Sequence, residues 1–247
     1  PTVVGAVSRE KPVFVEDARF LRQQTDQRIK WALPGPMTMI DTLADRHYRS
    51  REKLAWEFAT ILNEEARELE AAGVDIIQFD EPAFNVFFDE VEDWGVAALE
   101  RAAEGLRAQT AVHICYGYGI TANTDWKATL GAEWRQYERT FPLLQRSTID
   151  IVSLECQHSH VPMELIELLR GKQVMVGAID VASEVIETPD EVAEVLRTAL
   201  QFVDSDKLIA STNCGMAPMP RDVALAKMSA LAAGAGLVRD ELTAARP

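Results

Sequence analysis

The hydrophobic positions of the chain gather in six short runs that are rich in valine and isoleucine and mostly lack alternating polar residues. Strands that are buried on both faces of a parallel sheet have this pattern. Amphipathic, charged segments separate the runs, as helices between parallel strands would. We therefore predict strands at Arg28–Leu33, Val74–Phe79, Thr110–Cys115, Ile149–Glu155, Gln173–Ile179 and Lys207–Thr212.

Local signals mark the limits of the helices between these strands. The segment from Ser50 to Ala72 is long and charged on its outer side, and Gly73 follows it directly, which is typical of a helix end. Thr188-Pro189-Asp190-Glu191 has the form of a capping box with proline at the first helical position. Alanine, leucine and methionine recur at helical spacing from Arg221 to Ala233, which predicts a third helix.

Strands that alternate with helices imply a parallel sheet, either closed into a barrel or doubly wound. No glycine-rich phosphate-binding turn follows any predicted strand, which disfavours a nucleotide-binding doubly wound fold. We predict a (βα)8 TIM-type barrel that forms a single domain over residues 1–247. The start of the chain, an extended stretch at Thr2–Val7 and a helix at Pro12–Thr25, supplies no further strand–helix unit. We therefore expect the first two βα units of the barrel to lie upstream of Pro1.

The composition limits the classes of partner that we expect to bind and the compartment in which we expect the protein. The 247 residues carry a net charge of −14 and the sequence pI is about 4.8, which argues against nucleic acid or an anionic membrane as a partner. Three cysteines, an odd number, do not form a disulfide framework and fit a reducing, cytoplasmic compartment. We expect neither a membrane span nor a signal peptide.

Side chains that can bind a metal stand at the carboxyl ends of three predicted strands. His113 and Cys115 lie two residues apart and so point to the same face of their strand, Glu155 ends another strand, and Cys214 follows the last. This set of nitrogen, sulfur and oxygen ligands suits Zn²⁺. The alternative is a buried strand histidine with buried thiols, because free cysteine is among the most buried residue types. Since the carboxyl ends of barrel strands meet at one mouth, we favour the metal site.

Two aspartates stand at further strand ends, Asp80 in Asp80-Glu81-Pro82 and Asp180 after Gln173–Ile179. Either one alone has an ordinary explanation as a helix cap. Their position at the same mouth as the candidate metal ligands favours a role in the chemistry.

Several of these strand ends resemble motifs of the cobalamin-independent methionine synthase family. The resemblance runs in order from Pro12 to near the C-terminus, and it includes Leu33–Thr38 (LPGPMT), which is similar to the family's G-P-x-T. The other matching segments are Val74–Pro82 (VDIIQFDEP), His113–Tyr116 (HICY), Ser153–Glu155 (SLE), Gly177–Ser183 (GAIDVAS) and Asn213–Gly215 (NCG).

The resemblance implies a role for each candidate residue. Asp80 matches the carboxylate that holds the amino group of homocysteine, and its neighbour Glu81 is expected to contact the substrate as well. Asp180 matches a catalytic aspartate on the side of the methyl donor. The zinc ligands that the family implies are His113, Cys115, Glu155 and Cys214. Four other residues are expected to be structural or to lie at the surface: Cys156, His47, His158 and His160.

The ligand charges indicate the chemistry. Two thiolates and one carboxylate overcompensate Zn²⁺, so the metal can lower the pKa of an incoming thiol and still leave the thiolate nucleophilic. We therefore predict a zinc-dependent enzyme of methionine biosynthesis that transfers a methyl group to the thiol of homocysteine. The alternatives are alkyl transfer to another small thiol such as coenzyme M, and a catalytically silent zinc-binding subunit. Asp80 argues against the silent subunit, which would need no amino-acid clamp.

Two departures from the family concern the methyl donor. Ala182 stands where the family has a histidine that protonates the departing folate nitrogen, and Thr42 stands where it has a tryptophan that stacks on the folate. The donor is therefore left open between a methylfolate and a methyl-corrinoid, with or without an auxiliary protein. Without a general acid we expect slow turnover with free methyltetrahydrofolate, and a modest gain from Ala182→His.

Overall fold

The structure is a computed structural model that describes residues 1–117 and 125–244. The chain divides into two compact units, which we call unit 1 and unit 2. Unit 1 comprises Pro1–Ile114 and Pro142–Val152, and unit 2 comprises Cys115–Phe141 and Ser153–Pro247. Two elements run through the boundaries, β6 (Ile151–Glu155) and α7 (Tyr137–Arg146). The single domain expected over residues 1–247 stays a prediction.

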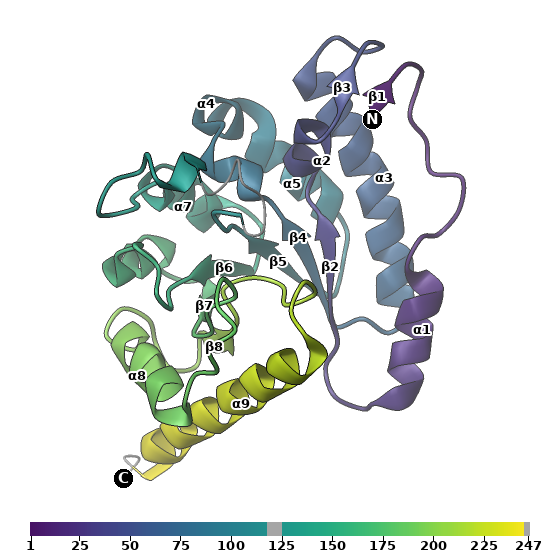
Figure 1. Cartoon of the computed structure of the whole chain (residues 1–247). Helices are drawn as coiled ribbons and strands as arrows, with labels where there is room; N and C mark the ends of the chain where they lie inside the picture. The colour runs from purple at the N-terminus through teal and green to yellow at the C-terminus, as the bar shows by residue number, and fades with distance from the viewer. Residues whose placement is uncertain (118–124, 245–247) are drawn as a thin grey trace. The chain divides into compact units, whose positions relative to one another are not determined.

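Three parallel strands form the centre of unit 1, in the order β2 (Lys30–Pro34), β4 (Ile76–Asp80) and β5 (Gln109–His113) (Figure 1). The register pairs Pro34 with Asp80 and Asp80 with His113, so the three strands end level with one another. Their side chains are largely buried, as their continuous apolar sequences predict. This alignment brings the residues at the carboxyl ends of the strands to one edge of the sheet.

The helix α3 (Arg51–Ala71) covers these strands and packs against α2 (Pro36–Asp41) and α5 (Val96–Ala103). The Ser50 hydroxyl caps α3 by accepting a hydrogen bond from the Lys53 N–H, and Gly73 follows the helix at φ 95°, as predicted. The remaining elements of unit 1 are β1 (Thr2–Val3), α1 (Val15–Gln24), β3 (Ala44–Asp45), η1 (Pro82–Asn85), α4 (Phe88–Glu90) and η2 (Val91–Gly95).

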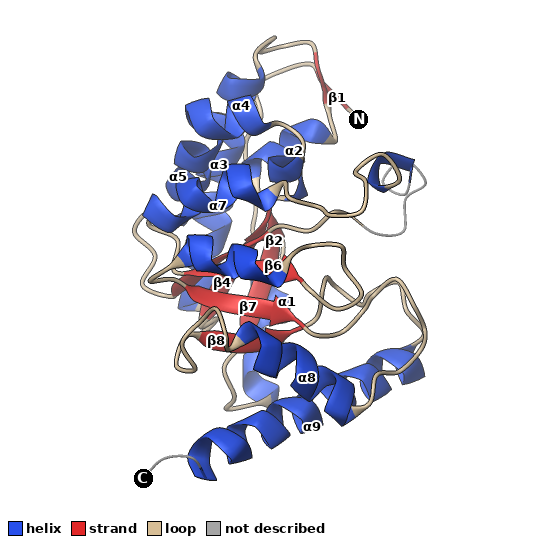
Figure 2. Ribbon diagram, turned by 90° about the vertical axis from the view of Figure 1, so that its left-hand side faces the viewer, coloured by secondary structure: helices blue, strands red, loops and turns tan. Residues whose placement is uncertain are grey.

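Unit 2 contains the parallel pair β7 (Gln173–Gly177) and β8 (Leu208–Ser211), together with η3 (Met163–Leu169). Two helices, α8 (Pro189–Ala199) and α9 (Arg221–Ala244), pack against each other (Figure 2). The capping box predicted at Thr188 is present, with Glu191 as its partner.

All six predicted strands are present, with bounds that differ by one or two residues at most ends. Every pairing within either unit is parallel, and helices join the strands, which confirms the α/β class with a parallel sheet. Over residues 1–117 and 125–244, no helix is long and apolar enough to cross a membrane.

Candidate functional site

Two of the predicted metal ligands, Cys115 and Cys214, lie side by side although 99 positions separate them in the sequence, with their sulfur atoms 3.8 Å apart. Cys115 follows β5 and is buried, and Cys214 follows β8 and is half-buried. Two thiolates bound to one tetrahedral zinc ion, each at about 2.3 Å, would lie about 3.8 Å from each other. The spacing of the two sulfur atoms therefore fits a shared zinc ion.

A third predicted ligand, His113, completes the cluster. The ligand atoms of His113, Cys115 and Cys214 all lie within 4.8 Å of one another. His113 is the last residue of β5 and is buried, so its ring is held by the strand that also places Cys115. One nitrogen and two sulfur atoms in this arrangement could supply three of the ligands of a four-coordinate zinc site.

The fourth predicted ligand, Glu155, is not one of the three residues in this compact cluster. It ends β6, its side chain is buried, and its Oε1 accepts a hydrogen bond from the Tyr116 N–H at 3.0 Å. Its negative charge nevertheless helps to raise the pKa of the Cys115 thiol, so the carboxylate acts on this site electrostatically. Ligation of a metal by Glu155 stays a prediction.

The surroundings of Cys115 disfavour the charged form of its thiol. The pKa of Cys115 lies well above its ordinary value, first because of its hydrogen bond with Cys214 and then because of burial. Additional thiolate charge is disfavoured in this setting, whereas a bound divalent cation would reverse the preference and release protons. The donor set therefore fits the metal that the sequence predicts.

The remaining cysteine, Cys156, lies outside the cluster. Its backbone N–H donates to the carbonyl of Gly177 and to Asn213 Oδ1. Burial raises the pKa of the Cys156 thiol to about 12, which makes it a poor source of thiolate. Cys156 is thus a natural control for substitutions at the other two cysteines.

Asp80 lies next to His113 along the edge of unit 1. It ends β4 and is paired in register with His113, the last residue of β5, so the two side chains leave the sheet on the same face. Asp80 is half-buried, and its Oδ1 accepts a hydrogen bond from Gln78 Nε2 at 2.7 Å. A carboxylate in this position suits an ammonium group held close to the cluster.

Glu81, by contrast, is fully buried and faces the start of α2. Its carboxylate accepts hydrogen bonds from the N–H groups of Met37 and Thr38 and from the Thr38 hydroxyl, at 2.8 to 3.0 Å. It therefore caps a helix N-terminus from a neighbouring strand end. Burial, the largest cause, raises the pKa of Glu81 to about 7. Substrate binding by Glu81 stays a prediction.

Asp180 lies in the loop that follows β7, where its Oδ1 accepts a hydrogen bond from the Ala182 N–H at 2.8 Å. Its other oxygen lies 3.4 Å from Nδ1 of His158, a residue that the sequence interpretation placed at the surface. The His158 side chain is indeed exposed, but it faces this aspartate. The backbone of the same loop is bound by the buried pair Lys227–Glu187, which the sequence interpretation did not identify.

The sequence contains only weak signals for the positions of His158 and Lys227. His158 follows Glu155 by only three positions, yet a strand pattern does not show which way a loop residue turns. Lys227 interrupts an apolar helical stripe in Arg221–Ala233, and a lysine at such a position predicts a buried ion pair when a carboxylate lies within reach.

The other residues that the sequence interpretation singled out have local roles. Thr42 ends α2, and its hydroxyl donates to the Met39 carbonyl, while Ala182 is exposed. His47 packs edge-on against the Tyr48 ring, and His160 Nδ1 lies 3.1 Å from the Ala132 carbonyl oxygen.

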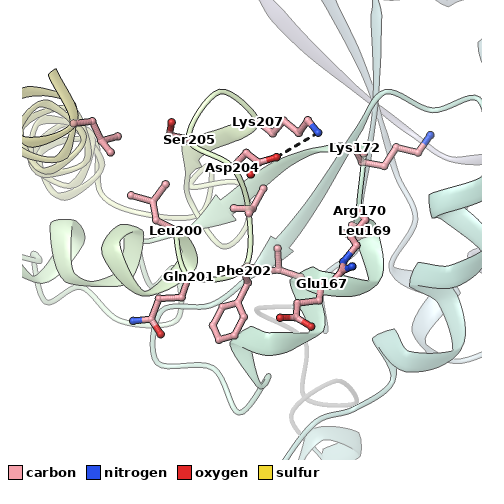
Figure 3. Close-up of a pocket in the computed structure, with 14 residues that line it drawn as sticks. Glu167, Leu169, Arg170, Lys172, Leu200, Gln201, Phe202, Asp204, Ser205 and Lys207 are labelled. Carbon is pink, nitrogen blue, oxygen red and sulfur yellow. Dashed lines mark ion pairs between the residues drawn. The ribbon is translucent and has the colours of Figure 1, made fainter. Parts of the chain in front are cut away.

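A hollow of about 660 Å³ in unit 2 lies away from these residues (Figure 3). Its lining includes Lys172, which precedes β7, and Lys207, which precedes β8 and forms an ion pair with Asp204. The hollow therefore opens at the amino ends of the two strands, whereas Asp180 and Cys214 follow their carboxyl ends. Chemistry in α/β folds takes place at the carboxyl ends.

Comparison with known proteins places this arrangement in a family. Residues 1–236 match the sequence model described as cobalamin-independent synthase, catalytic domain. A methionine synthase from Sulfurisphaera tokodaii is 29% identical over 98% of this chain and 66% of its own length, so the chain spans about two thirds of this relative. A 2-hydroxypropyl-CoM lyase from Xanthobacter autotrophicus is 31% identical over 99% of this chain and 70% of its own.

A solved structure is similar over nearly the whole chain. It is that of a B12-independent methionine synthase from Shewanella sp. W3-18-1 in complex with selenomethionine. The two proteins are 75% identical, with a TM-score of 0.96, over 99% of this chain and 72% of the Shewanella chain.

Proposed function

Since the chain belongs to the cobalamin-independent synthase catalytic-domain family, we propose that it transfers a methyl group to the thiol of homocysteine to form methionine. The observation that carries this proposal is the pair of sulfur atoms of Cys115 and Cys214, 3.8 Å apart, with His113 beside them. The name of the 75% identical Shewanella protein supports the same activity.

In this proposal, different residues bind the metal, bind homocysteine and act on the methyl donor. His113, Cys115 and Cys214 would hold zinc, and Glu155 would be the fourth ligand. Zinc bound there would lower the pKa of the substrate thiol and keep the thiolate nucleophilic. Asp80, level with His113 on the next strand, would bind the ammonium group of homocysteine and so orient its thiol. Asp180 would act on the side of the methyl donor.

We further propose that the parallel strands belong to a TIM-type barrel. The TM-score of 0.96 to the Shewanella structure supports a shared fold, and the level ends of β4 and β5 fit the mouth of such a barrel. In this architecture the candidate ligands and Asp80 come from the carboxyl ends of β4, β5, β6 and β8, which is where TIM-barrel enzymes carry their chemistry.

A second candidate is alkyl transfer that involves coenzyme M. The 31% identity to a 2-hydroxypropyl-CoM lyase over 99% of this chain favours it, because a zinc–thiolate site can serve either thiol. Asp80 discriminates between the two. Its carboxylate attracts the ammonium group of an amino acid but repels the sulfonate of coenzyme M. We therefore rank homocysteine first.

One assay tests the proposal. Full-length protein with zinc and homocysteine is offered methyltetrahydrofolate and methylcobalamin in separate reactions, and methionine is measured. We expect methionine with at least one donor, loss of activity after chelation, and recovery when zinc is restored. Absence of methionine with both donors would contradict the proposal, and turnover with coenzyme M in place of homocysteine would favour the second candidate.

A further inference from the structure

An imidazole lies beside Asp180 in unit 2. His158 Nδ1 is 3.4 Å from Asp180 Oδ2, and Nε2 of the same ring is 3.3 Å from Nε2 of Gln157. Glu191 of α8 is a second carboxylate close enough to interact with the ring, since the charge of His158 contributes to the lowered pKa of Glu191, whose largest cause is the Thr188 N–H. Two carboxylates, those of Asp180 and Glu191, therefore lie near this imidazole.

The backbone of Asp180 is held by two buried side chains. Its N–H donates to Glu187 Oε1 at 2.8 Å, and its carbonyl accepts from Lys227 Nζ at 2.9 Å. Lys227 and Glu187 form a buried ion pair, with side chains 0% and 4% exposed. Because an ion pair that is buried and fully hydrogen-bonded is hard to displace, it fixes the loop that presents Asp180.

The position of the ring is fixed as well. His158 has φ 51°, a left-handed conformation that L-residues rarely adopt and that histidine, asparagine and aspartate tolerate better than most. The chain enters this turn through two anchored residues, because Asn213 Oδ1 accepts from the N–H groups of Cys156 and Gln157. Asn213 also precedes Cys214 directly.

The pair therefore lies at the same strand ends as the candidate metal ligands of unit 2. His158 follows Glu155 by three residues at the end of β6, and Asp180 follows the end of β7 by three. The Cys156 N–H donates to the Gly177 carbonyl, which ties these two strand ends together. The exposed face of the ring is open to a ligand that approaches this edge.

Methyl transfer from a tertiary amine needs a proton at the leaving nitrogen, because an amine anion is a poor leaving group. On the basis of the proposed function, we propose that His158, oriented by Asp180, donates that proton. As the sulfur–carbon bond forms, the carbon–nitrogen bond breaks and its electron pair goes to the nitrogen, which takes the proton that Nε2 of His158 carries once this atom is released from Nε2 of Gln157. Neutral imidazole remains and is reprotonated from water. With His158 in this role, the methyl-donor side has a general acid even though Ala182 stands where the family has its histidine.

The two methyl donors separate this role from a structural one. A methylfolate leaves through nitrogen and needs the proton, whereas methylcobalamin leaves as a cobalt species and does not. His158→Asn keeps a residue that tolerates the left-handed turn but removes the acid. We expect it to reduce methionine formation from methyltetrahydrofolate by ~10²-fold or more, as for loss of a general acid, with the methylcobalamin rate unchanged. His160→Asn, two residues along and also exposed, is the matched control and leaves both rates unchanged.

His158→Gly relieves the left-handed backbone and provides two further readouts. We expect its melting temperature to equal or exceed that of the wild type, and added imidazole to restore part of the folate-dependent rate. A wild type that uses only methylcobalamin, an equal loss with both donors, or a His158→Asn variant with full folate activity would each overturn the inference. Failure of the wild type with both donors would instead overturn the proposed function.

Discussion

At the scale of single residues, the register between β4 and β5 decides which side chains share the candidate site. Asp80 and His113 are paired across the two strands, so the expected amino-acid clamp and a candidate metal ligand are neighbours without any loop between them. The sequence was sufficient to predict His113, Cys115 and Cys214 as neighbours because each stands at a strand end. It was not sufficient for His158, whose direction depends on a left-handed turn.

Asp80→Asn tests the clamp. The substitution keeps the shape of the side chain and removes its charge, so it should raise the KM for homocysteine by ~10–100-fold, the effect of losing a charge-assisted hydrogen bond. Zinc content should not change, because Asp80 is not a member of the ligand cluster. Steady-state kinetics and metal analysis of the same preparation measure both. Loss of zinc in parallel with activity would show that Asp80 supports the site structurally.

At the scale of elements, the sequence pattern predicted where the C-terminal helix begins but not where it ends. The helix predicted over Arg221–Ala233 continues to Ala244, through Gly234. A Cβ added at Gly234 would lie 2.6 Å from the Val192 side chain of α8, so this glycine permits close packing of two helices and does not end one. Sequence alone cannot distinguish these two uses of glycine, because they differ only in what lies opposite.

The contact between Glu81 and α2 predicts a pH dependence of stability. The folded protein raises the pKa of Glu81 from 4.5 to about 7, so the folded state binds the proton more tightly than the unfolded state does. Glu81 therefore favours folding most at low pH, and this contribution is lost as the pH rises through 7. The difference between the two pKa values corresponds to about 3 kcal/mol in the free energy of unfolding.

Glu81→Gln removes this titration and keeps an acceptor for Thr38. Urea unfolding of both proteins at pH 5 and pH 8 measures it. From pH 5 to pH 8, we expect the free energy of unfolding of the variant, taken relative to that of the wild type, to rise by up to about 3 kcal/mol. A stability difference that is the same at both pH values would mean that Glu81 titrates normally.

At the scale of the whole molecule, the acidic chain brings its thiols together from distant parts of the sequence. A net charge of −14 favours the uptake of a cation at a site that contains two thiols and a nearby carboxylate. The family match over residues 1–236 agrees with the methyltransferase that the sequence predicts, whereas the methyl donor depends on loops that pattern reasoning does not resolve.

The zinc content of purified full-length protein tests the central claim most directly. Metal analysis should find about one zinc per chain in the wild type and in Cys156→Ser, whose thiol lies outside the cluster. Cys115→Ser and Cys214→Ser should each contain almost none while remaining folded by circular dichroism, because a structural collapse is not needed to lose one of two thiolate ligands. A wild type without zinc, or a Cys214→Ser variant that binds as much zinc as Cys156→Ser, would contradict the account.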